Sequence, residues 1–443
     1  MNNRLITVMV LFLTLHLSAQ DKWSLKQCIE YGLVHNGNNT IYANEKLSAD
    51  ARAKEALADY LPKISLTSTL DNNLKVQQSV IPAGVFGDKP VKVAFTQKYN
   101  ANATAQLDQT IYDQSLLIGL KANKYNKQQA ELNSIQSQES IIYNICTAYF
   151  QISVYQQQLE LLKLNRETYS KQIELFGLQV SKGVTLQKDL DKVTVDFNNN
   201  SSQIRVAESN LQLSENELKF EMGYPILQTI AVEIVSKERI PSVLLEEPSV
   251  DFNVVARTDY KISETNIKLL DIEKDRIRAA GLPKLTAYAR YGAVGFGEVL
   301  KDTYGEILDF SAVGLKLSIP ILDFYKRNAQ YSQAKFNRIN AEEKLKLDQG
   351  RYTVDYQNAR ARVIEAQVNT ENDQRNVALA DSVLRTTDLQ FQKGVTDLND
   401  WLNSQNALKE AQNSYVKSLY NFYLAKIDLE KAGGTLKTFY NSL

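Results

Sequence analysis

The side chains that could carry out chemistry are few and widely spaced in this 443-residue chain. Its histidines are His16 and His35, and its cysteines are Cys28 and Cys146, which stand 118 positions apart. A histidine triad or a histidine-ligated metal cluster cannot be built from these residues within one chain. We interpret the cysteines as isolated thiols, and no two carboxylates are placed as a catalytic pair. The sequence therefore predicts no enzymatic activity, no cofactor and no bound metal.

The overall composition excludes a strongly basic nucleic-acid binder, because 51 Lys and Arg are balanced by 51 Asp and Glu. Aromatic residues do alternate with lysines near Trp401 and over Tyr415–Tyr423. Their helical spacing indicates packing rather than base stacking, so we expect no nucleic-acid partner. Only 18 Gly and 8 Pro punctuate the chain, which favours long elements over small layered domains.

Short motifs occur twice in the chain and in the same order. They are Leu-Pro-Lys at 61–63 and 282–284, Ile-x-Asp at 111–113 and 321–323, and Lys-Gly-Val-Thr at 182–185 and 393–396. Each copy therefore runs from a helix through Leu-Pro-Lys and an extended segment to an aspartate, then through a very long helix to Lys-Gly-Val-Thr and a second helix. The chain is an internal duplication.

The extended segments alternate apolar and polar residues, as strands with one face in lipid and one in water do. We predict strands at 64–70 and 93–107 in the first copy, and at 285–291 and 313–319 in the second. Pro82, Gly84, Gly87 and Pro90 mark the loop of the first hairpin. Gly295, Gly297 and Gly305 mark the loop of the second.

The long helices show a 3-4 spacing of apolar residues that is typical of coiled coils. In the first copy this seam runs from Ile145 to Val180 and only Arg166 interrupts it; in the second it runs from Val363 to Phe391 and is more polar. The helix from Ser115 to Val180 would be about 100 Å long at 1.5 Å per residue.

Each long helix is expected to end at a left-handed glycine, Gly183 or Gly394. Thr185 and Thr396 would then cap the returning helices. The fold class predicted is thus a mixed α and β membrane protein with duplicated antiparallel helical hairpins, each carrying a β-hairpin at the end opposite its tip.

The amino end has the pattern of a secretory signal peptide. Arg4 precedes an apolar stretch over 5–17, and Ser18-Ala19-Gln20 provides a small-residue exit, so cleavage is expected between Ala19 and Asp21. Cys28 lies too far downstream for a lipoprotein signal, and we expect no lipid anchor there. After residue 20 no run of 18 apolar residues occurs, so we expect no transmembrane helix there.

These patterns give the domain boundaries. We predict a signal peptide over 1–20, a first repeat over 21–223 with its β-hairpin at about 62–112, a linker over 224–248, a second repeat over 249–435 with its β-hairpin at about 283–322, and a tail over 436–443. In the linker, Val232 and Ile234 could form a short strand before Pro241 and Pro248.

Four membrane strands cannot stand alone, because their edges would face lipid unpaired. Two copies would give eight strands, whose interior side chains fill, whereas three copies give twelve strands around a lumen. A homotrimer is the smallest assembly that forms a conduit.

The chain resembles the TolC-type outer-membrane factors of the outer membrane efflux protein family over about residues 22–435. The resemblance rests on the duplication, on Leu-Pro-Lys before each β-hairpin, and on Gly-x5-Asp at Gly183–Asp189 and Gly394–Asp400. It implies a trimeric twelve-stranded barrel in outer-membrane lipid and a periplasmic α-helical barrel closed at its tip. It also implies a periplasmic adaptor, an inner-membrane transporter, and a role as exit duct for efflux or type I secretion.

The resemblance also suggests roles for residues at the two tips. Gly183, Val184 and Thr185, with Gly394, Val395 and Thr396, match the region that meets the adaptor. Asp400 matches an acidic position of the periplasmic entrance, whereas a second acidic position is Asn403 here. An arginine that helps to lock the closed tip in some members is replaced by Thr396, so Asp189 lacks that partner. Both aspartates could instead be ordinary acids at a helix start.

Three other classes of protein share some of these features. A periplasmic adaptor has one helical hairpin but no full duplication, and a coiled-coil scaffold has no alternating β-hairpins. An exported enzyme would need a catalytic cluster.

Overall fold

The computed structural model describes residues 22–85, 87–234 and 252–443. The predicted signal peptide lies outside these residues, as do Pro241 and Pro248 of the linker. The chain divides into two compact units, which we call the helical unit (up to 44, 131–263 and 344–443) and the sheet unit (45–130 and 264–343). Among the described residues, no helix has both the length and the apolar composition needed to cross a membrane.

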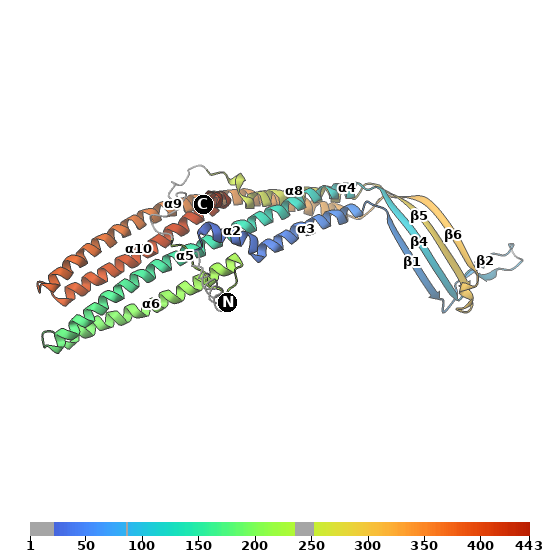
Figure 1. Ribbon diagram of the computed structural model, residues 1–443. Coiled ribbons are helices and arrows are strands. Elements are labelled where there is room, and N and C mark those ends of the chain that lie inside the picture. The colour runs from blue at the N-terminus through green and yellow to red at the C-terminus, as the bar shows by residue number, and fades with distance from the viewer. Residues whose placement is uncertain (1–21, 86, 235–251) are drawn as a thin grey trace, which may run out of the picture. The chain divides into compact units, whose positions relative to one another are not determined.

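The sheet unit contains a four-stranded antiparallel sheet in the order β1-β4-β5-β6 (Figure 1). Its strands are β1 (Lys63–Asn72), β4 (Tyr99–Tyr112), β5 (Lys284–Gly297) and β6 (Ile307–Ser318). The short strands β2 (Gln78–Ile81) and β3 (Val91–Ala94) form a separate two-stranded sheet. Each copy of the duplication thus supplies one hairpin, and β4 and β5 join the two hairpins into one sheet.

Two details of the predicted strands were wrong. The single strand expected over 93–107 is divided between β3 and β4, because Asn73 binds the carbonyls of Gln97 and Lys98 and closes the main hairpin there. Gly295 and Gly297 lie inside β5 rather than in a loop. Their missing side chains make room for Thr303 of the short 3-10 helix Asp302–Tyr304, since a Cβ at Gly295 would lie 2.0 Å from the Thr303 carbonyl oxygen.

The helices range from 7 residues in α4 and α11 to 67 residues in α9. They are α2 (Leu25–His35), α3 (Gly37–Ala58), α4 (Gln114–Leu120), α5 (Ala122–Ser181), α6 (Gln187–Met222), α8 (Thr258–Ala279), α9 (Lys326–Gln392), α10 (Leu398–Gly433) and α11 (Leu436–Ser442), with a 3-10 turn at Val254–Ala256. The helix expected from Ser115 is broken at Lys121, where an N–H to Ile118 contact tightens the turn. The last eight residues, predicted as a tail, contain α11 instead.

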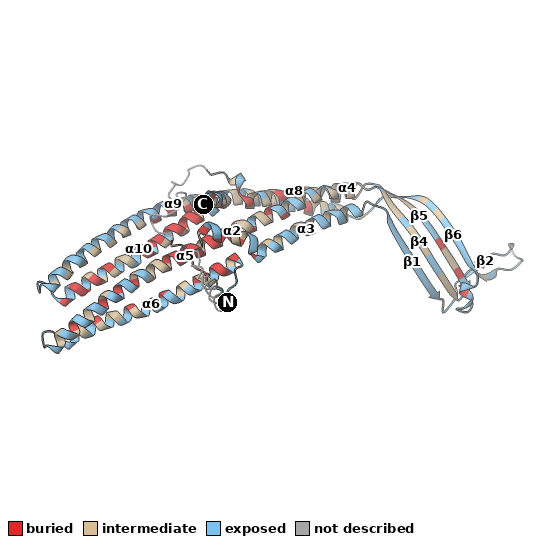
Figure 2. Ribbon diagram, viewed as in Figure 1, coloured by how far each residue is buried: buried red, intermediate tan, exposed pale blue. Residues whose placement is uncertain are grey.

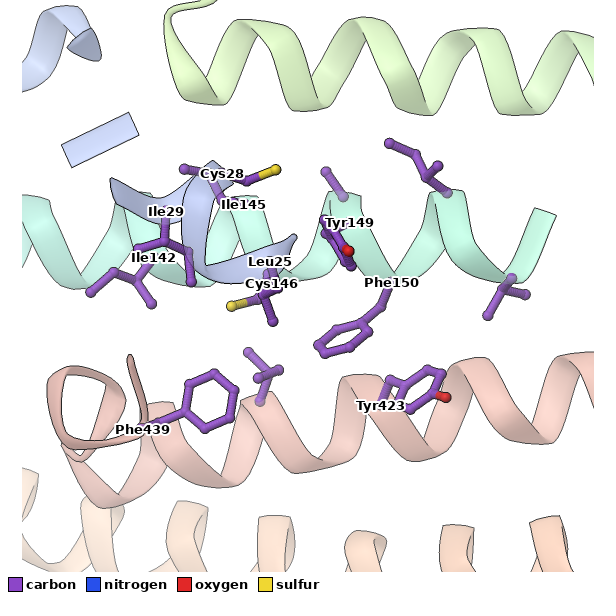
Figure 3. Packing of buried hydrophobic residues seen from close by; sticks show 14 of the residues in the cluster. Leu25, Cys28, Ile29, Ile142, Ile145, Cys146, Tyr149, Phe150, Tyr423 and Phe439 are labelled. Carbon is purple, nitrogen blue, oxygen red and sulfur yellow. The ribbon is translucent and has the colours of Figure 1, made fainter. Parts of the chain in front are cut away.

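The core of the helical unit lies where α2, α5, α10 and α11 meet. Figure 3 shows Cys28 and Ile29 of α2 beside Ile145 and Cys146 of α5, with Phe439 of α11 nearby. Both thiols are free and fully buried, and burial raises the pKa of Cys28 to about 12. Both thiols are free, as predicted, but they are not isolated, because they belong to one core cluster in which burial and then Cys28 raise the pKa of Cys146. Such buried thiols are unreactive.

The coiled-coil seam of α5 is confirmed with one correction. Its members Ile145, Ala148, Ile152, Leu162, Tyr169 and Phe176 are buried. Arg166, however, points to solvent, and its neighbour Asn165 takes the interior position. An ideal helix drifts relative to a 3.5-residue repeat, so adjacent positions can exchange along a seam of this length. The seam of α9 is buried at Val363 and Ala366 and half-buried from Thr370 onward.

The start of the linker packs on the amino end of the described chain. Val232 forms a single parallel bridge with Trp23 rather than a strand. Tyr149 of α5 lies below this bridge, with its hydroxyl 3.2 Å from the carbonyl oxygen of Trp23 and 2.9 Å from that of Glu233. This buried tyrosine therefore fastens the linker to the core.

Candidate functional site

The two tips of the helical hairpins have the same backbone geometry. Gly183 and Gly394 are left-handed, with φ of +70° and +72°. The N–H of each glycine bonds a carbonyl three residues back, and the N–H of the following valine bonds a carbonyl five residues back. This is the Schellman motif that satisfies the last carbonyls of a helix. The predicted glycine stops are confirmed.

The predicted threonine caps were wrong. Leu186 occupies the N-cap position of α6 and makes no side-chain cap, so Thr185 lies one residue too early. Asp397 caps α10 by accepting the N–H of Asp400 at 3.0 Å. Thr396 instead donates its hydroxyl to the carboxylate of Asp400.

The acidic residues predicted at the entrance both lie in the first turn of a helix. Asp400 is exposed, and so is Asn403 one turn further on. Asp189 is half-buried, and its carboxylate lies 3.8 Å from the ammonium of Lys192. Negative charge is favourable at these positions because it opposes the helix dipole. The structure thus supports the helix-start interpretation of both acids, and their role at an entrance stays a prediction.

Lys192 connects the two tips, a role that the sequence did not indicate. Its ammonium donates to the side-chain oxygen of Asn399 at 2.9 Å, across 207 positions of sequence. Asp189, which lacks the arginine partner of some family members, therefore belongs to a chain of contacts that runs from α6 to α10. Asp189 and Lys192 stand three positions apart, a spacing that could have indicated an ion pair within one helix, whereas nothing in the sequence points to Asn399.

An apolar cluster behind the tips joins the four long helices. It consists of Tyr169, Phe176, Val193, Leu398, Trp401 and Leu402, with Leu384 and Phe391 packed against it. The indole N–H of Trp401 donates to Asp388 of α9 at 3.0 Å, and its ring meets Tyr169 edge-on. Trp401 is 1% exposed, which confirms its interpretation as a packing residue. The tips are therefore held from behind by packing that involves both copies.

The four-stranded sheet has one apolar and one polar face, as the alternation predicts. The pairings of Ile64 with Leu107, and of Leu315 with Ala287, place apolar side chains on a common face. This face also carries Leu66, Leu70, Ala103, Ala105, Leu285, Ala289, Val313 and Leu317. Ile64, Leu66, Val313 and Leu315 are each more than two-thirds exposed, so the described part of the chain leaves them largely uncovered. Much of β1 and β6 is accordingly coloured as exposed in Figure 2.

The opposite face of the sheet is hydrophilic. It carries Ser65, Thr67, Thr69, Asn100, Asn102, Thr104, Gln106, Asp108, Thr286, Arg290, Lys316 and Ser318. Two glycines on this face allow aromatic rings to lie against the backbone: a Cβ at Gly292 would lie 2.4 Å from the Phe310 ring, and one at Gly314 would lie 2.7 Å from the Tyr288 hydroxyl. This face is suited to contact with water, whereas the other is suited to contact with lipid.

The junction between sheet and helices is anchored by Asp113 and Lys284. Asp113 accepts the N–H groups of Ser115 and Leu116 and so caps α4, and its second oxygen lies 2.8 Å from the Lys284 ammonium. Burial alone raises the pKa of Asp113, but these hydrogen bonds outweigh it and hold the pKa below its usual range. The lysine of the second Leu-Pro-Lys motif thus pairs with the aspartate of the first Ile-x-Asp motif, and this ion pair links the two copies.

Over the part of the chain that is described, no group of three or more His, Cys, Asp or Glu residues is arranged to hold a metal ion. The functional surfaces are instead extended ones: paired helical tips, and a sheet with a lipid-compatible face and a water-compatible face. Such a chain is a subunit of a membrane channel with a helical extension.

Comparison with known proteins identifies the kind of channel. The model of the family described as "Outer membrane efflux protein" matches residues 44–224 and 274–435, and the chain belongs to this family. It is 22% identical over 346 residues to the outer membrane protein TolC of Vibrio cholerae, covering 76% of this chain and 77% of TolC. It is 24% identical to the alkaline protease secretion protein AprF of Pseudomonas aeruginosa, covering 68% and 62% of the two chains.

The fold is shared with solved structures of the same kind. The outer membrane protein VceC of Vibrio cholerae aligns over 93% of this chain and 96% of its own, with a TM-score of 0.73 and 16% identity. The predicted fold class and family resemblance are confirmed. The chain is an outer-membrane efflux protein with a periplasmic helical extension. This assignment replaces the alternative interpretations as a periplasmic adaptor or a free coiled-coil scaffold.

Proposed function

We propose that three copies of this chain form a passive duct that carries cargo from the periplasmic side of the outer membrane to the exterior. The observation that supports this most is the two-faced sheet, whose apolar side chains are exposed in the single chain and whose polar side chains line the other face. Closing twelve such strands into a barrel places the apolar face in lipid and the polar face around a water-filled lumen.

The helical hairpins would continue this lumen into the periplasm. The half-buried seam of α9 from Thr370 onward offers a surface that neighbouring helices of an assembly can cover. Three chains contribute twelve helical columns, and their six tips would form the periplasmic end of the duct. No chemistry is assigned to the chain, so the energy for transport comes from a partner in the inner membrane.

A periplasmic adaptor is the proposed partner of the tips. Val184 and Val395 are each 72% exposed on rigid turns, and they present the same motif twice per chain. Six equivalent contacts around a trimer would allow a ring of adaptor hairpins to dock. Because docking contacts can favour one state of the tips over another, the adaptor would open the entrance by population shift.

We propose that Asp400 forms an acidic ring at this entrance and favours cations. Its exposure leaves the carboxylate accessible to water, and the hydrogen bond from Thr396 fixes its orientation. Asn403 would contribute a neutral ring one turn away. Asp189 is engaged with Lys192 and would stabilise the closed tip rather than select ions.

The family description refers to efflux, and the name of AprF refers to the secretion of a protease, so two kinds of cargo are suggested, effluxed compounds and a secreted protein. We assign the choice of cargo to the inner-membrane transporter.

The test is the mass and the conductance of the detergent-extracted protein. A trimer that forms discrete cation-selective channels in a planar bilayer is the expected result. A monomer recovered from the soluble periplasmic fraction would overturn the proposal.

A further inference from the structure

The helical unit contains a small cavity that belongs neither to the tips nor to the sheet. Trp23 precedes α2, Tyr31 lies on α2, and Tyr224 follows α6 at the start of the linker; all three line this cavity of about 500 Å³, a volume typical of small-molecule sites. We propose that the cavity binds a small organic cation of the methylated-ammonium class, held between the three rings and the carboxylate of Glu30. The site goes beyond the proposed duct and does not depend on it.

The three rings, which we call the aromatic corner, stand at steep angles to one another. The centroid of the Trp23 ring lies 5.4 Å from that of Tyr31 and 5.8 Å from that of Tyr224, and the two tyrosine centroids are 5.7 Å apart. The corresponding planes meet at 89°, 77° and 60°. In a box with three such walls the centre lies about 4 Å from each centroid, which is within the reach of cation–π attraction. A single cation at that point would face all three rings.

The Tyr31 ring is held in place by His35. The two rings are stacked, with centroids 3.9 Å apart and planes 14° from parallel. The His35 Nδ1 lies 3.0 Å from the main-chain carbonyl oxygen of Tyr31 and donates a hydrogen bond to it. One face of the Tyr31 ring is therefore covered, and the ring is fixed for a ligand on its other side.

Tyr224 is positioned by a close approach of the ends of α2 and α6. Gly223 has a φ of +69°, and a Cβ on it would lie 2.4 Å from the carbonyl oxygen of His35. The glycine therefore lets the two helix ends meet, and Tyr224 follows it directly. The side-chain amide of Asn36 also donates to the carbonyl oxygen of Glu221 at 2.6 Å.

Trp23 is positioned by main-chain hydrogen bonds to the linker. Its N–H donates to the carbonyl oxygen of Ala231 at 2.8 Å, and its own carbonyl oxygen accepts the N–H of Glu233 at 3.0 Å. All three walls of the aromatic corner are thus fixed by contacts outside the cavity. A preorganised site of this kind loses less conformational entropy when its ligand binds.

The charge at the cavity is negative. Glu30 lies on its wall and is exposed, and it forms no ion pair within the described part of the chain. None of the residues that line the cavity is basic. The side-chain oxygen of Gln27, on the same wall, already accepts the N–H of Ser24 at 2.9 Å. A carboxylate beside aromatic rings, with no lining cation to compete, favours a positively charged ligand.

The chemistry of the wall favours an organic cation over a metal ion. Hard cations such as Ca²⁺ need several oxygen ligands, whereas Glu30 is the only carboxylate among the residues that line this cavity. Aromatic rings and one acidic group suit an ammonium that carries methyl groups. Such a ligand would touch the amino end of the described chain, α2 and the linker at once. Its binding would therefore stabilise their contact, because a ligand of the folded state raises stability.

The proposal is tested by calorimetric titration of the full-length protein in a maltoside detergent, which carries no ammonium group. The probes are choline and its uncharged isostere, a dimethylbutanol in which carbon replaces the ammonium nitrogen. Choline should bind saturably, and the isostere should bind about tenfold more weakly. The fluorescence of Trp23 should change with choline, and Trp401→Phe, which removes the other tryptophan of the chain, should keep that change.

Substitutions locate the ligand in the cavity. Glu30→Gln and Tyr224→Leu should each weaken choline binding about fivefold, whereas Tyr224→Phe, which keeps the ring, should retain it. The matched control is Glu45→Gln, because Glu45 is an exposed acid on α3 that does not line the cavity; this variant should bind choline as the native protein does. Circular dichroism checks that each variant is folded.

Three results would each overturn the proposal. Equal binding of choline and its isostere would mean that the cavity has no preference for charge. Choline binding that survives both Glu30→Gln and Tyr224→Leu would place the ligand elsewhere. A native protein without saturable binding would mean that the three rings only pack on one another. None of these results changes the mass or the conductance of the assembly, so the duct and the cation site fail separately.

Discussion

Tyr169 offers a sharp test of the packing behind the helical tips, because its hydroxyl is buried without a hydrogen-bond partner. The residue is 0% exposed and meets Trp401 edge-on at 6.4 Å. Burial raises the pKa of Tyr169 to about 12, with a further contribution from the charge of Asp196. A buried hydroxyl without a partner costs about 1–3 kcal/mol, so Tyr169→Phe should stabilise the protein by about 1 kcal/mol.

Tyr149→Phe is the matched control, since it removes the same atom from a side chain that is 1% exposed. The Tyr149 hydroxyl lies within hydrogen-bond distance of the Trp23 and Glu233 carbonyl oxygens. Its loss should destabilise the protein by about 1 kcal/mol, because the hydrogen bonding of a buried hydroxyl is removed. The two substitutions are thus expected to have opposite signs.

The assay is urea unfolding in detergent, followed by tryptophan fluorescence and circular dichroism. All variants are compared at one protein concentration, because the stability of an oligomer depends on it. If Tyr169→Phe lowered the midpoint as much as Tyr149→Phe does, the Tyr169 hydroxyl would have a partner and the reasoning would be refuted.

Three further predictions concern the tips and the pH dependence of stability. Gly183→Ala should lower the free energy of unfolding by about 1 kcal/mol, because Gly183 has a φ of +70°. Gly177→Ala within α5 should raise it by up to about 1 kcal/mol, because there is open space where the Cβ would lie. Equal effects of the two substitutions in urea titrations would contradict this. Asp400→Asn should reduce cation selectivity in bilayer recordings and Asn403→Asp should increase it, and unchanged selectivity in both would remove the acidic ring. Burial raises the pKa of Glu139, although the hydrogen bond from Thr258 opposes this, so the folded state favours the protonated carboxyl and stability should rise as pH falls from 7 toward the usual glutamate pKa. Glu139→Gln should abolish that rise, and the variant should melt at a higher temperature than the native protein at pH 7. If the substitution left the pH dependence unchanged, another group would be its cause.

The features that could be predicted from sequence are those fixed by local chemistry. A left-handed turn after a helix strongly favours glycine, so Gly183 and Gly394 could be recognised directly. Strand faces follow from a period of two, so Ile64, Leu66 and Leu315 could be assigned to a common type of surface. The duplication strengthened the prediction of the glycine turns and the prediction of the strand faces, because each pattern appears twice.

The features that could not be predicted depend on contacts between distant residues or on a shift of one position. Gly295 reads as a turn residue until the approach of Thr303 is known. Lys192 meets Asn399 only after both hairpins have folded. Asn165 and Arg166 are neighbours on one helix, and a heptad pattern cannot decide which faces inward when both are polar. The cap of α10 was missed in the same way, since Asp397 lies one position after Thr396.

The two copies of the duplication differ in features that change stability little, and they agree in features whose change would disrupt the fold. A cap contributes about 1 kcal/mol, so α6 can begin at Leu186 without one while Asp397 caps α10. A strand register has no such latitude, because a slip of one residue exchanges every lipid-facing side chain for a polar one. The register of the two hairpins is accordingly identical, and the pairing of β4 with β5 continues both faces of the sheet from one hairpin to the other.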